Sequence, residues 1–464
     1  MAGFKLKKGV LERDKPESPR MRLCVDFGTA ACKAVASLGT SEKLFLIPLG
    51  QASGDATQRF SVSSSLFLAN NRLYFGHEAI RVSLRQKAFT TRRIESLKTW
   101  LGRGEMSDPD GVQLEADQNP DGGDFSRGDA LTMLLAFVLD HATTALHKQA
   151  GVRYIKRRFT RPVWDQARAT WYDGLMARYI TRGQLVADTL SGEWSGGLPM
   201  SVVREVLDQA RAIDPCPWLV DPRGALEPVA AGFSRMEREY EHRTLAVVVD
   251  IGAGTTDMAS LVAIQPDGEG QVRRAKPQGK PTSELNAGDT LDEILRNHIL
   301  EGIDIPGGQE DELSVQLDQN CRLWKEELFI SGSVQPTFAG GVVGKEIRRE
   351  NFLRLGAVRT FESKIRDQFD SQLESVASLA ETLASSGFHP LTSIRIIPAG
   401  GGARLPVVSS LGGQRKLRGV NFLLSPTDLE PRWFAKMYGG GDPNLFPKLA
   451  VATGGASPWL PDAN

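Results

Sequence analysis

Short apolar runs and longer amphipathic stripes alternate along this sequence. Three runs are short enough to be buried strands, and each ends in a glycine-rich turn; they lie at residues 22–25, 245–249 and 394–397. Between them, apolar residues recur at spacings of three and four, as on one face of a helix, at residues 131–146, 291–298 and 373–383. Strands interleaved with long helices predict an α/β fold built in layers.

The strand and turn near the start recur in altered form near residue 250, which predicts two related halves. We expect lobe I over residues 21–243, and lobe II over residues 244–464 with a C-terminal return to lobe I. Residues 1–20 mix Lys, Glu, Arg and Pro and are expected to form a flexible N-terminal tail. Stretches rich in Gly, Pro and Asp predict loops, the last of them on a hairpin, at residues 104–128, 192–200 and 265–282.

Composition narrows the class of protein. A chain of 464 residues with 41% apolar residues and a mean hydropathy of −0.24 is expected to fold around more than one core. Fifty-six basic residues balance 56 acidic ones, which disfavours nucleic acid as a partner. We find no apolar window of about 18 residues, so no membrane span is expected and the protein is expected to be cytoplasmic. The four cysteines are too scattered to predict a zinc or redox site.

Two of the glycine turns carry acidic residues at positions suited to a metal-bound phosphate. They read DFGT at residues 26–29 and DIGAGTTD at residues 250–257. A carboxylate at the end of a buried strand can hold a hydrated Mg²⁺, while glycine lets backbone N–H groups approach phosphate oxygens. Two such turns opposed across a cleft would hold a polyphosphate from both sides, with their acids directed at one shared metal.

The third turn, AGGGARLP at residues 399–406, has no acid and is not expected to bind metal. Its bare backbone suits a flat group such as a nucleoside, on which Arg404 could stack or to which it could donate hydrogen bonds. The sequence lacks the P-loop and dinucleotide-binding motifs, as well as the zinc-protease and serine-hydrolase motifs. These absences disfavour the other common nucleotide-binding and hydrolytic folds.

In this order and spacing, the three turns resemble the phosphate-1, phosphate-2 and adenosine motifs of the actin-like ATPase superfamily. Within it, they are most similar to the nucleotide-binding domain of the heat shock protein 70 family, over about residues 21–457. Four further segments carry the resemblance, at residues 60–80, 94–104, 161–174 and 225–233. The resemblance implies an α/β, actin-like ATPase fold, in which two lobes of duplicated ribonuclease-H-like domains surround a nucleotide cleft.

The resemblance also implies ATP and Mg²⁺ as ligands and gives roles to single residues. Lys98 matches the catalytic lysine, and Glu227 matches the acid that couples nucleotide state to domain motion and positions the attacking water. The implied catalytic residues are Lys98, Glu227, Thr255 and Asp257. The implied Mg²⁺ site is Asp26, Asp250 and Asp257. The implied nucleotide contacts are Gly28, Thr29, Ala30, Gly252, Ala253, Gly254, Thr255, Lys325, Gly400, Gly401, Gly402 and Arg404.

The sequence departs from the family pattern in several places. Arg322 stands where the family has Glu, and Glu326 stands where it usually has a basic residue beside adenine, so base preference is expected to differ. Ala30 and Ala31 replace hydroxyl and aromatic residues, which could weaken the binding of phosphates at the first turn. Residues 181–217 look like an insertion. The chain ends soon after residue 457 without the family's peptide-binding domain, so a client or operon-encoded protein partner is expected to supply recognition.

We therefore expect a chaperone-like ATPase that hydrolyses Mg-ATP slowly and acts as a nucleotide-dependent switch. Phosphoryl transfer to water requires charge neutralisation and a positioned nucleophile, both of which Mg²⁺ and a lysine can supply. Replacing Lys98 or Thr255 with Ala, or Asp257 with Asn, is expected to slow hydrolysis and leave the fold intact. The alternatives are an actin-like filament-forming ATPase and a nucleotide-binding pseudo-ATPase scaffold. A sugar or acetate kinase is disfavoured because no acceptor-binding motif is visible.

Overall fold

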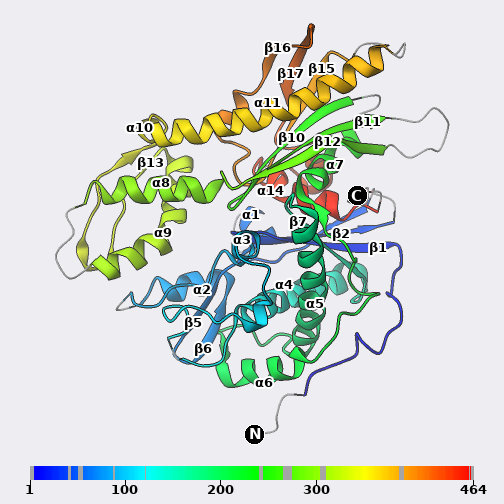
Figure 1. The fold of residues 1–464 in the computed structure, drawn as a ribbon. Helices are drawn as coiled ribbons and strands as arrows, with labels where there is room; N and C mark the ends of the chain where they lie inside the picture. The colour runs from blue at the N-terminus through cyan, green and yellow to red at the C-terminus, as the bar shows by residue number, and fades with distance from the viewer. Residues whose placement is uncertain are drawn as a thin grey trace.

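The computed structural model describes most of the 464 residues. The exceptions are residues 1–4, 40–42, 51–55, 87–88, 121, 240–243, 265–273, 304–309, 386–390, 441, 459 and 461–464. The described chain alternates strands and helices and forms mixed sheets, which confirms the α/β class. Figure 1 shows two sheets stacked one above the other, with helices on their outer faces and between them.

The two large sheets repeat one arrangement of strands. The first has the order β3 (Lys43–Leu46), β2 (Ala31–Leu38), β1 (Met21–Phe27), β7 (Lys156–Arg161) and β9 (Ala225–Leu226), with β4 (Ser61–Ser63) also on β2. The second has the order β12 (Arg274–Glu284), β11 (Thr256–Ile264), β10 (Thr244–Ile251), β15 (Ser393–Ala399), β17 (Val420–Pro426) and β16 (Gly413–Leu417). In both, a central strand pairs antiparallel with the next strand along the chain and parallel with a later one.

The central strands are apolar over most of their length because both faces of each sheet are covered. In β10, Val247 and Val249 face one core, whereas Ala246 and Val248 face another. The same alternation in β1 directs Val25 into a third core. Successive side chains of a strand point to opposite faces, so a sheet buried on both sides needs an unbroken apolar run. The three strands predicted at residues 22–25, 245–249 and 394–397 are confirmed for this reason.

Helices occupy three layers. The pair α4 (Arg127–Ala150) and α5 (Gln166–Thr189) packs on the outer face of the first sheet. The pair α7 (Glu227–Glu239) and α14 (Leu445–Gly455) lies between the two sheets, and α11 (Gly356–Ser385) covers the second sheet (Figure 1). The helices predicted at residues 131–146, 291–298 and 373–383 are confirmed as parts of α4, α8 (Gly288–Leu300) and α11.

The smaller elements extend each half. In the first half these are α1 (Ala56–Phe60), β5 (Leu66–Ala69), β6 (Arg72–Phe75), α2 (Gly76–Ser83), α3 (Leu97–Arg103), β8 (Leu198–Pro199) and α6 (Met200–Arg211). In the second half they are α9 (Glu310–Ser331), β13 (Ser333–Val334), β14 (Ile347–Arg348), α10 (Arg349–Phe352), α12 (Pro406–Ser409) and α13 (Arg432–Tyr438). Single 3₁₀ turns lie at Pro109–Gly111 and Ala339–Gly341.

The C-terminal helix α14 joins the two halves. It contacts β1 and β2 of the first sheet and β15 of the second, and it crosses α7. A Cβ on Gly454 would overlap the carbonyl oxygen of Ala230 in α7, so glycine is needed for the two backbones to come this close. This tight crossing fixes the two sheets on a common central layer of helices.

The N-terminal segment differs from the flexible tail that the sequence predicts. Residues 5–20 are irregular but lie against the first half, with Leu6 and Val10 buried in its core. The Lys7 N–H donates to Thr189 Oγ1 at 2.9 Å, and the Glu17 N–H donates to the Tyr154 carbonyl at 2.8 Å. Two apolar side chains spaced along a charged segment are sufficient to dock it.

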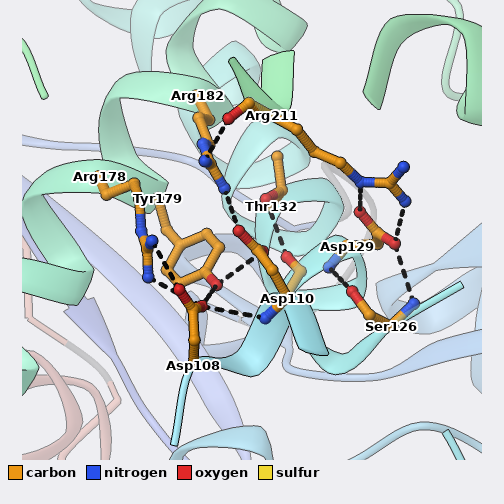
Figure 2. A network of polar contacts seen from close by, with 10 residues as sticks. Asp108, Asp110, Ser126, Asp129, Thr132, Arg178, Tyr179, Arg182 and Arg211 are labelled. Atoms are coloured by element: carbon orange, nitrogen blue, oxygen red, sulfur yellow. Dashed lines mark hydrogen bonds and ion pairs between the residues drawn. The ribbon is translucent and has the colours of Figure 1, made fainter. Parts of the chain in front are cut away.

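The segment predicted as an insertion, residues 181–217, is a built part of the first half. It contains the end of α5, the short strand β8 and the helix α6. Figure 2 shows the contacts of its arginines: Arg182 bonds Asp110, in the predicted loop at residues 104–128, at 2.7 Å, and Arg211 bonds Asp129, in the first turn of α4, at 2.7 Å. Upstream on α5, Arg178 binds Asp108 with both nitrogens at 2.9 Å. These ion pairs anchor the loop to the helices.

The other two predicted loops have mixed outcomes. Residues 192–200 are mostly irregular but include β8. Of residues 265–282, the first nine lie outside the described part of the chain, and the rest belong to β12. The strand β12 pairs antiparallel with β11, as expected of a hairpin. Residue propensities do not predict this strand because Lys, Pro and Gly interrupt it. Pairing with β11 stabilises the strand despite this composition.

One helix among the described residues, α4, is long and apolar enough by composition to cross a membrane. This differs from the expectation that no such window exists, because very few charged side chains interrupt the middle of the helix. However, 78% of the apolar window is buried inside the fold. Packing against α5 and the first sheet accounts for its apolar character.

Candidate functional site

Three predicted acids come together between the two sheets. Asp26 is the last residue but one of β1, while Asp250 and Asp257 lie opposite each other on the hairpin of β10 and β11. All three are buried. Burial raises the pKa of Asp250 well above its usual range, and the nearby carboxylates of Glu227, Asp257 and Asp26 raise it further. Sheets with the same topology thus direct their acids toward one place, where burial and the neighbouring carboxyl groups oppose the ionisation of Asp250.

The first turn is held by a lysine that the sequence analysis missed. Lys33 Nζ forms an ion pair with Asp26 Oδ2 at 3.1 Å, and Thr160 Oγ1 donates to Asp26 Oδ1 at 3.1 Å. The same ammonium would lie 3.1 Å from a Cβ on Gly28, so it stands beside the turn. The signal was the alternation of β2, which directs Lys33 to the same face of the sheet as Asp26, its partner on β1. A cation at this position suits an anionic ligand.

The first and second turns face each other directly. A Cβ on Gly254 would lie 2.5 Å from Thr99 Oγ1 and 2.8 Å from Thr29 Oγ1. The space that remains between the turns is a cavity of about 20 Å³, lined in part by Lys98, Trp164 and Thr255. That is room for about one water molecule and not for a triphosphate. A polyphosphate would therefore need more room between the turns than this structure provides.

Lys98 and Glu227 form a buried ion pair next to this cavity. Their side chains are only 6% and 8% exposed. Burial opposes the charged form of Lys98, yet Glu227 and Asp26 together raise its pKa above the ordinary value. Burial raises the pKa of Glu227 to about 7, with Asp257 and Asp26 adding to the rise and Lys98 opposing it. The lysine therefore stays protonated, while the acid can exchange a proton near neutral pH.

Asp257 is fixed by several donors. The Val163 N–H donates to Asp257 Oδ1 at 3.2 Å, and the hydroxyls of Thr255 and Ser283 also bond the carboxylate. Burial nevertheless raises its pKa. The carboxylate is thus oriented beside the cavity that Thr255 lines, in a setting that favours a nearby cation.

The third turn lies against the second. Gly400 has φ of +76°, and a Cβ there would lie 2.5 Å from Asp250 Oδ1, so the turn needs glycine. The Gly402 N–H donates to the Ile251 carbonyl at 2.9 Å. Gly401 and Arg404 are exposed, and a Cβ on Gly401 would meet no atom within 4 Å. An open backbone edge with an arginine beside it is compatible with a flat ligand.

Lys325 is connected to the second turn through the start of α8. Its Nζ donates to the Gly288 carbonyl at 2.8 Å, and the Gly288 N–H donates to the Gly252 carbonyl at 3.0 Å. Lys325 also forms an ion pair with Asp292 at 2.8 Å. The Asp289 N–H donates a hydrogen bond of 2.7 Å to the carbonyl of Ala253, at the centre of the turn. The sequence analysis missed this contribution of α8. Its signal in the sequence was the pair Gly288-Asp289 at the start of the helix.

The residues that depart from the family pattern are accommodated by their surroundings. Arg322 forms ion pairs with Asp289 at 3.4 Å and Asp292 at 3.9 Å. Glu326, one turn along α9, is exposed. Ala30 remains at the first turn, where its carbonyl accepts the N–H of Ser64 at 2.9 Å. The two acids on α8 therefore balance the charge of Arg322 on α9, so this arginine is compatible with the packing of α8 against α9.

The donor set fits Mg²⁺ only in part. Among the described residues, no group of three or more His, Cys, Asp and Glu side chains is arranged to hold a metal ion. The predicted triad of Asp26, Asp250 and Asp257 is therefore not a preformed metal cage. Mg²⁺ usually keeps several waters and binds one or two carboxylates together with substrate phosphates. Buried carboxyl groups beside glycine turns fit that mode of binding.

The chain matches no known protein family and no curated protein closely enough to indicate kinship.

Proposed function

We propose that this protein is an ATPase of the actin-like superfamily, similar to the nucleotide-binding domain of heat shock protein 70, and that it switches conformation with its bound nucleotide. In this proposal the two sheets belong to two lobes of duplicated ribonuclease-H-like domains around a nucleotide cleft. The repeated strand order of the two sheets and the α7–α14 layer between them support it.

One observation carries the proposal. Two glycine turns from separate sheets face each other across the contact of Gly254 with Thr29, and each follows a buried aspartate, Asp26 or Asp250. Opposed backbone turns with converging carboxylates are what a metal-bound polyphosphate requires. Few other ligands would need this combination of bare backbone, buried acid and buried ammonium.

Each residue has a task in the proposed reaction. Mg²⁺ would be held by Asp26, Asp250 and Asp257. It would neutralise charge on the phosphates. Lys98 directs a permanent positive charge at the cavity between the turns. Glu227, paired with Lys98, can accept or release a proton near pH 7 and would orient an attacking water. Thr255 fixes the Asp257 carboxylate by a hydrogen bond.

The proposed nucleotide contacts fall into two groups. The phosphate turns would contribute Gly28, Thr29, Ala30, Gly252, Ala253 and Gly254, and the nucleoside side would contribute Lys325, Gly400, Gly401, Gly402 and Arg404. A chaperone-like switch of this kind, acting in the cytoplasm, would need a protein partner for substrate recognition. Neither nucleic acid nor a membrane is part of the proposal.

Phosphate release by the purified chain tests the proposal. The parent is expected to release phosphate from ATP slowly and only with Mg²⁺, and Asp257→Asn is expected to slow the release about 10²-fold or more. Binding of ATP without any release in either protein would favour the pseudo-ATPase scaffold. Absence of both binding and release would refute the proposal.

A further inference from the structure

The side chain of Tyr172 brings a polar hydroxyl group into an apolar core. Tyr172 lies on α5, and its side chain is fully buried in the core of the first half. Its Oη has no hydrogen-bond partner among the described residues. A buried polar group without a partner is costly, and folded proteins contain few of them. Phenylalanine would fill the same space without that cost, so the hydroxyl points to a role in function.

Other tyrosines of the first half have partners for their hydroxyl groups. Tyr179, about two turns further along α5, is also fully buried, yet its Oη donates to Asp110 Oδ1 at 2.8 Å (Figure 2). Tyr154, which is partly buried, donates from its Oη to Asp188 Oδ2 at 2.9 Å. These hydroxyls bond carboxylates within the first half, whereas Tyr172 keeps its donor unused.

The ring of Tyr172 packs against the wall of the candidate site. Its centroid lies 4.8 Å from that of the Trp164 ring, with the two ring planes at 76°. Trp164 lines the cavity between the turns together with Lys98. A Cβ on Gly102, one turn after Lys98 on α3, would lie 3.3 Å from Trp164 Cζ2. Tyr172 and Trp164 are therefore packed beside the helix that carries Lys98.

The charged groups of the candidate site act on the Tyr172 hydroxyl. Burial raises the pKa of Tyr172 above its ordinary value; Lys98 opposes the rise, whereas Glu227, Asp173 and Asp26 add to it. Tyr172 in turn helps to raise the pKa of Lys98. The hydroxyl therefore keeps its proton at neutral pH and remains a hydrogen-bond donor close to the buried ion pair.

Glu227 has Lys98 as its ion-pair partner in this structure. In the proposed reaction Lys98 directs its charge at the γ-phosphate, which draws the ammonium group away from Glu227. A buried carboxylate that loses its cation is strongly destabilised unless another donor replaces it. We propose that Tyr172 is a positioning residue that supplies this donor: with nucleotide bound, its hydroxyl donates to Glu227 and holds the carboxylate toward the attacking water. The inference rests on the proposed function.

Tyr172→Phe tests the inference, because it removes the hydroxyl and keeps the ring. Single-turnover hydrolysis of prebound Mg-ATP is expected to slow about tenfold, since one hydrogen bond to a charged group is lost. The KM for ATP should change by less than about twofold, because the hydroxyl does not touch the nucleotide. Without nucleotide, the melting temperature should equal or exceed that of the parent, because an unpartnered polar group has been removed.

Tyr179→Phe is the matched control on the same helix, and the opposite result is expected. Its melting temperature should fall, because Asp110 loses a hydrogen-bond donor. Its hydrolysis rate should equal that of the parent, because the Tyr179 hydroxyl bonds the loop at residues 104–128 and none of the reacting groups.

The pH dependence of the single-turnover rate is a readout that packing alone would not change. A donor to Glu227 favours its ionised form, so the rise of the rate with pH should move to higher pH in Tyr172→Phe. Lys98 on α3, Asp26 on β1 and Asp257 on β11 also act on Glu227, and all three remain in the variant. The shift therefore reports the loss of the hydroxyl.

Three results would contradict the inference. If Tyr172→Phe hydrolyses ATP at the parent rate and with the parent pH profile, the inference is wrong and the proposed function stands. A melting temperature that falls as in Tyr179→Phe would also overturn it, because the Tyr172 hydroxyl would then be bonded without nucleotide. If the parent releases no phosphate from Mg-ATP, the proposed function and the inference fail together.

Discussion

Lys98 on α3 and Glu227 at the start of α7 form a buried ion pair although they lie 129 residues apart in the chain. Each was assigned a catalytic role from a different sequence segment. Their contact puts a permanent cation and a titratable acid beside the cavity between the two phosphate turns. The pair thus connects α3 to the helix layer between the two sheets, and burial affects the pKa of both of its members.

The ion pair predicts that Lys98→Ala destabilises the fold, contrary to the expectation from sequence. Removing one partner of a buried pair typically costs about 3–5 kcal/mol because the other charge remains buried and unpaired. Urea unfolding at pH 8 measures the loss. At pH 5.5 the loss should be smaller, because the stranded Glu227 can take up a proton.

The double variant Lys98→Met with Glu227→Gln is the control for this effect. It removes both charges and keeps similar volumes, so it should be more stable than Lys98→Ala. A Lys98→Ala protein as stable as the parent at both pH values would mean that the pair is not buried in solution.

Thr255→Ala and Asp257→Asn are expected to slow hydrolysis about 10²-fold or more, because loss of one preorganised electrostatic contact has that effect. Both keep the local shape, so ATP binding should change much less than the rate. Single-turnover phosphate release with excess enzyme measures the chemical step. Parent-like rates in both variants would place the chemistry elsewhere.

Stability without nucleotide or Mg²⁺ should fall as pH rises from about 5 to 8. Glu227 has an ordinary pKa of 4.5 and a pKa of about 7 in the folded chain, so the folded state retains a proton that the unfolded state releases. The stabilising contribution is complete below pH 4.5 and is lost as pH passes through 7. Asp250 and Asp257 act in the same direction.

Melting curves across this pH range measure the effect, and Asp250→Asn is expected to flatten the dependence. Adding Mg²⁺ with nucleotide should also flatten it, since bound cations favour the ionised acids. Stability that rises steadily with pH between 5 and 8 would contradict the burial of these carboxylates.

Nucleotide-dependent switching and filament formation make different predictions. A switch should show ATP-dependent changes in protease protection near Glu227 while remaining small in solution, because the two halves change their relative position. A filament-forming ATPase should scatter light above a critical concentration. We expect protection without scattering; pelleting of ordered filaments with ATP would favour the filament alternative.

The sequence predicts the parts of the fold that depend on local pattern. The strands ending at Asp26 and Asp250 could be predicted because each is an unbroken apolar run followed by glycine. The helix α4 was evident from its apolar periodicity, although its suitability for a membrane by composition was not recognised. These features are encoded within a few consecutive residues.

Features that depend on tertiary contacts were missed. Docking of the N-terminal segment depends on Leu6 and Val10, whose spacing forms no regular period. Lys33 was overlooked because its role arises only when β2 pairs with β1 and directs it toward Asp26. The closed cavity could not be anticipated either, since it depends on how closely Gly254 approaches Thr29.

The central claim is that the opposed turns bind Mg-ATP, and the melting temperature of the chain with and without Mg-ATP tests it most directly. Ligand at about 100 times its dissociation constant should add about 2.7 kcal/mol to the free energy of unfolding. Asp26→Asn should lose this shift, whereas Asp370→Asn, at an exposed ion pair with Arg415, should keep it. A parent protein whose melting temperature does not change at millimolar Mg-ATP would contradict the account.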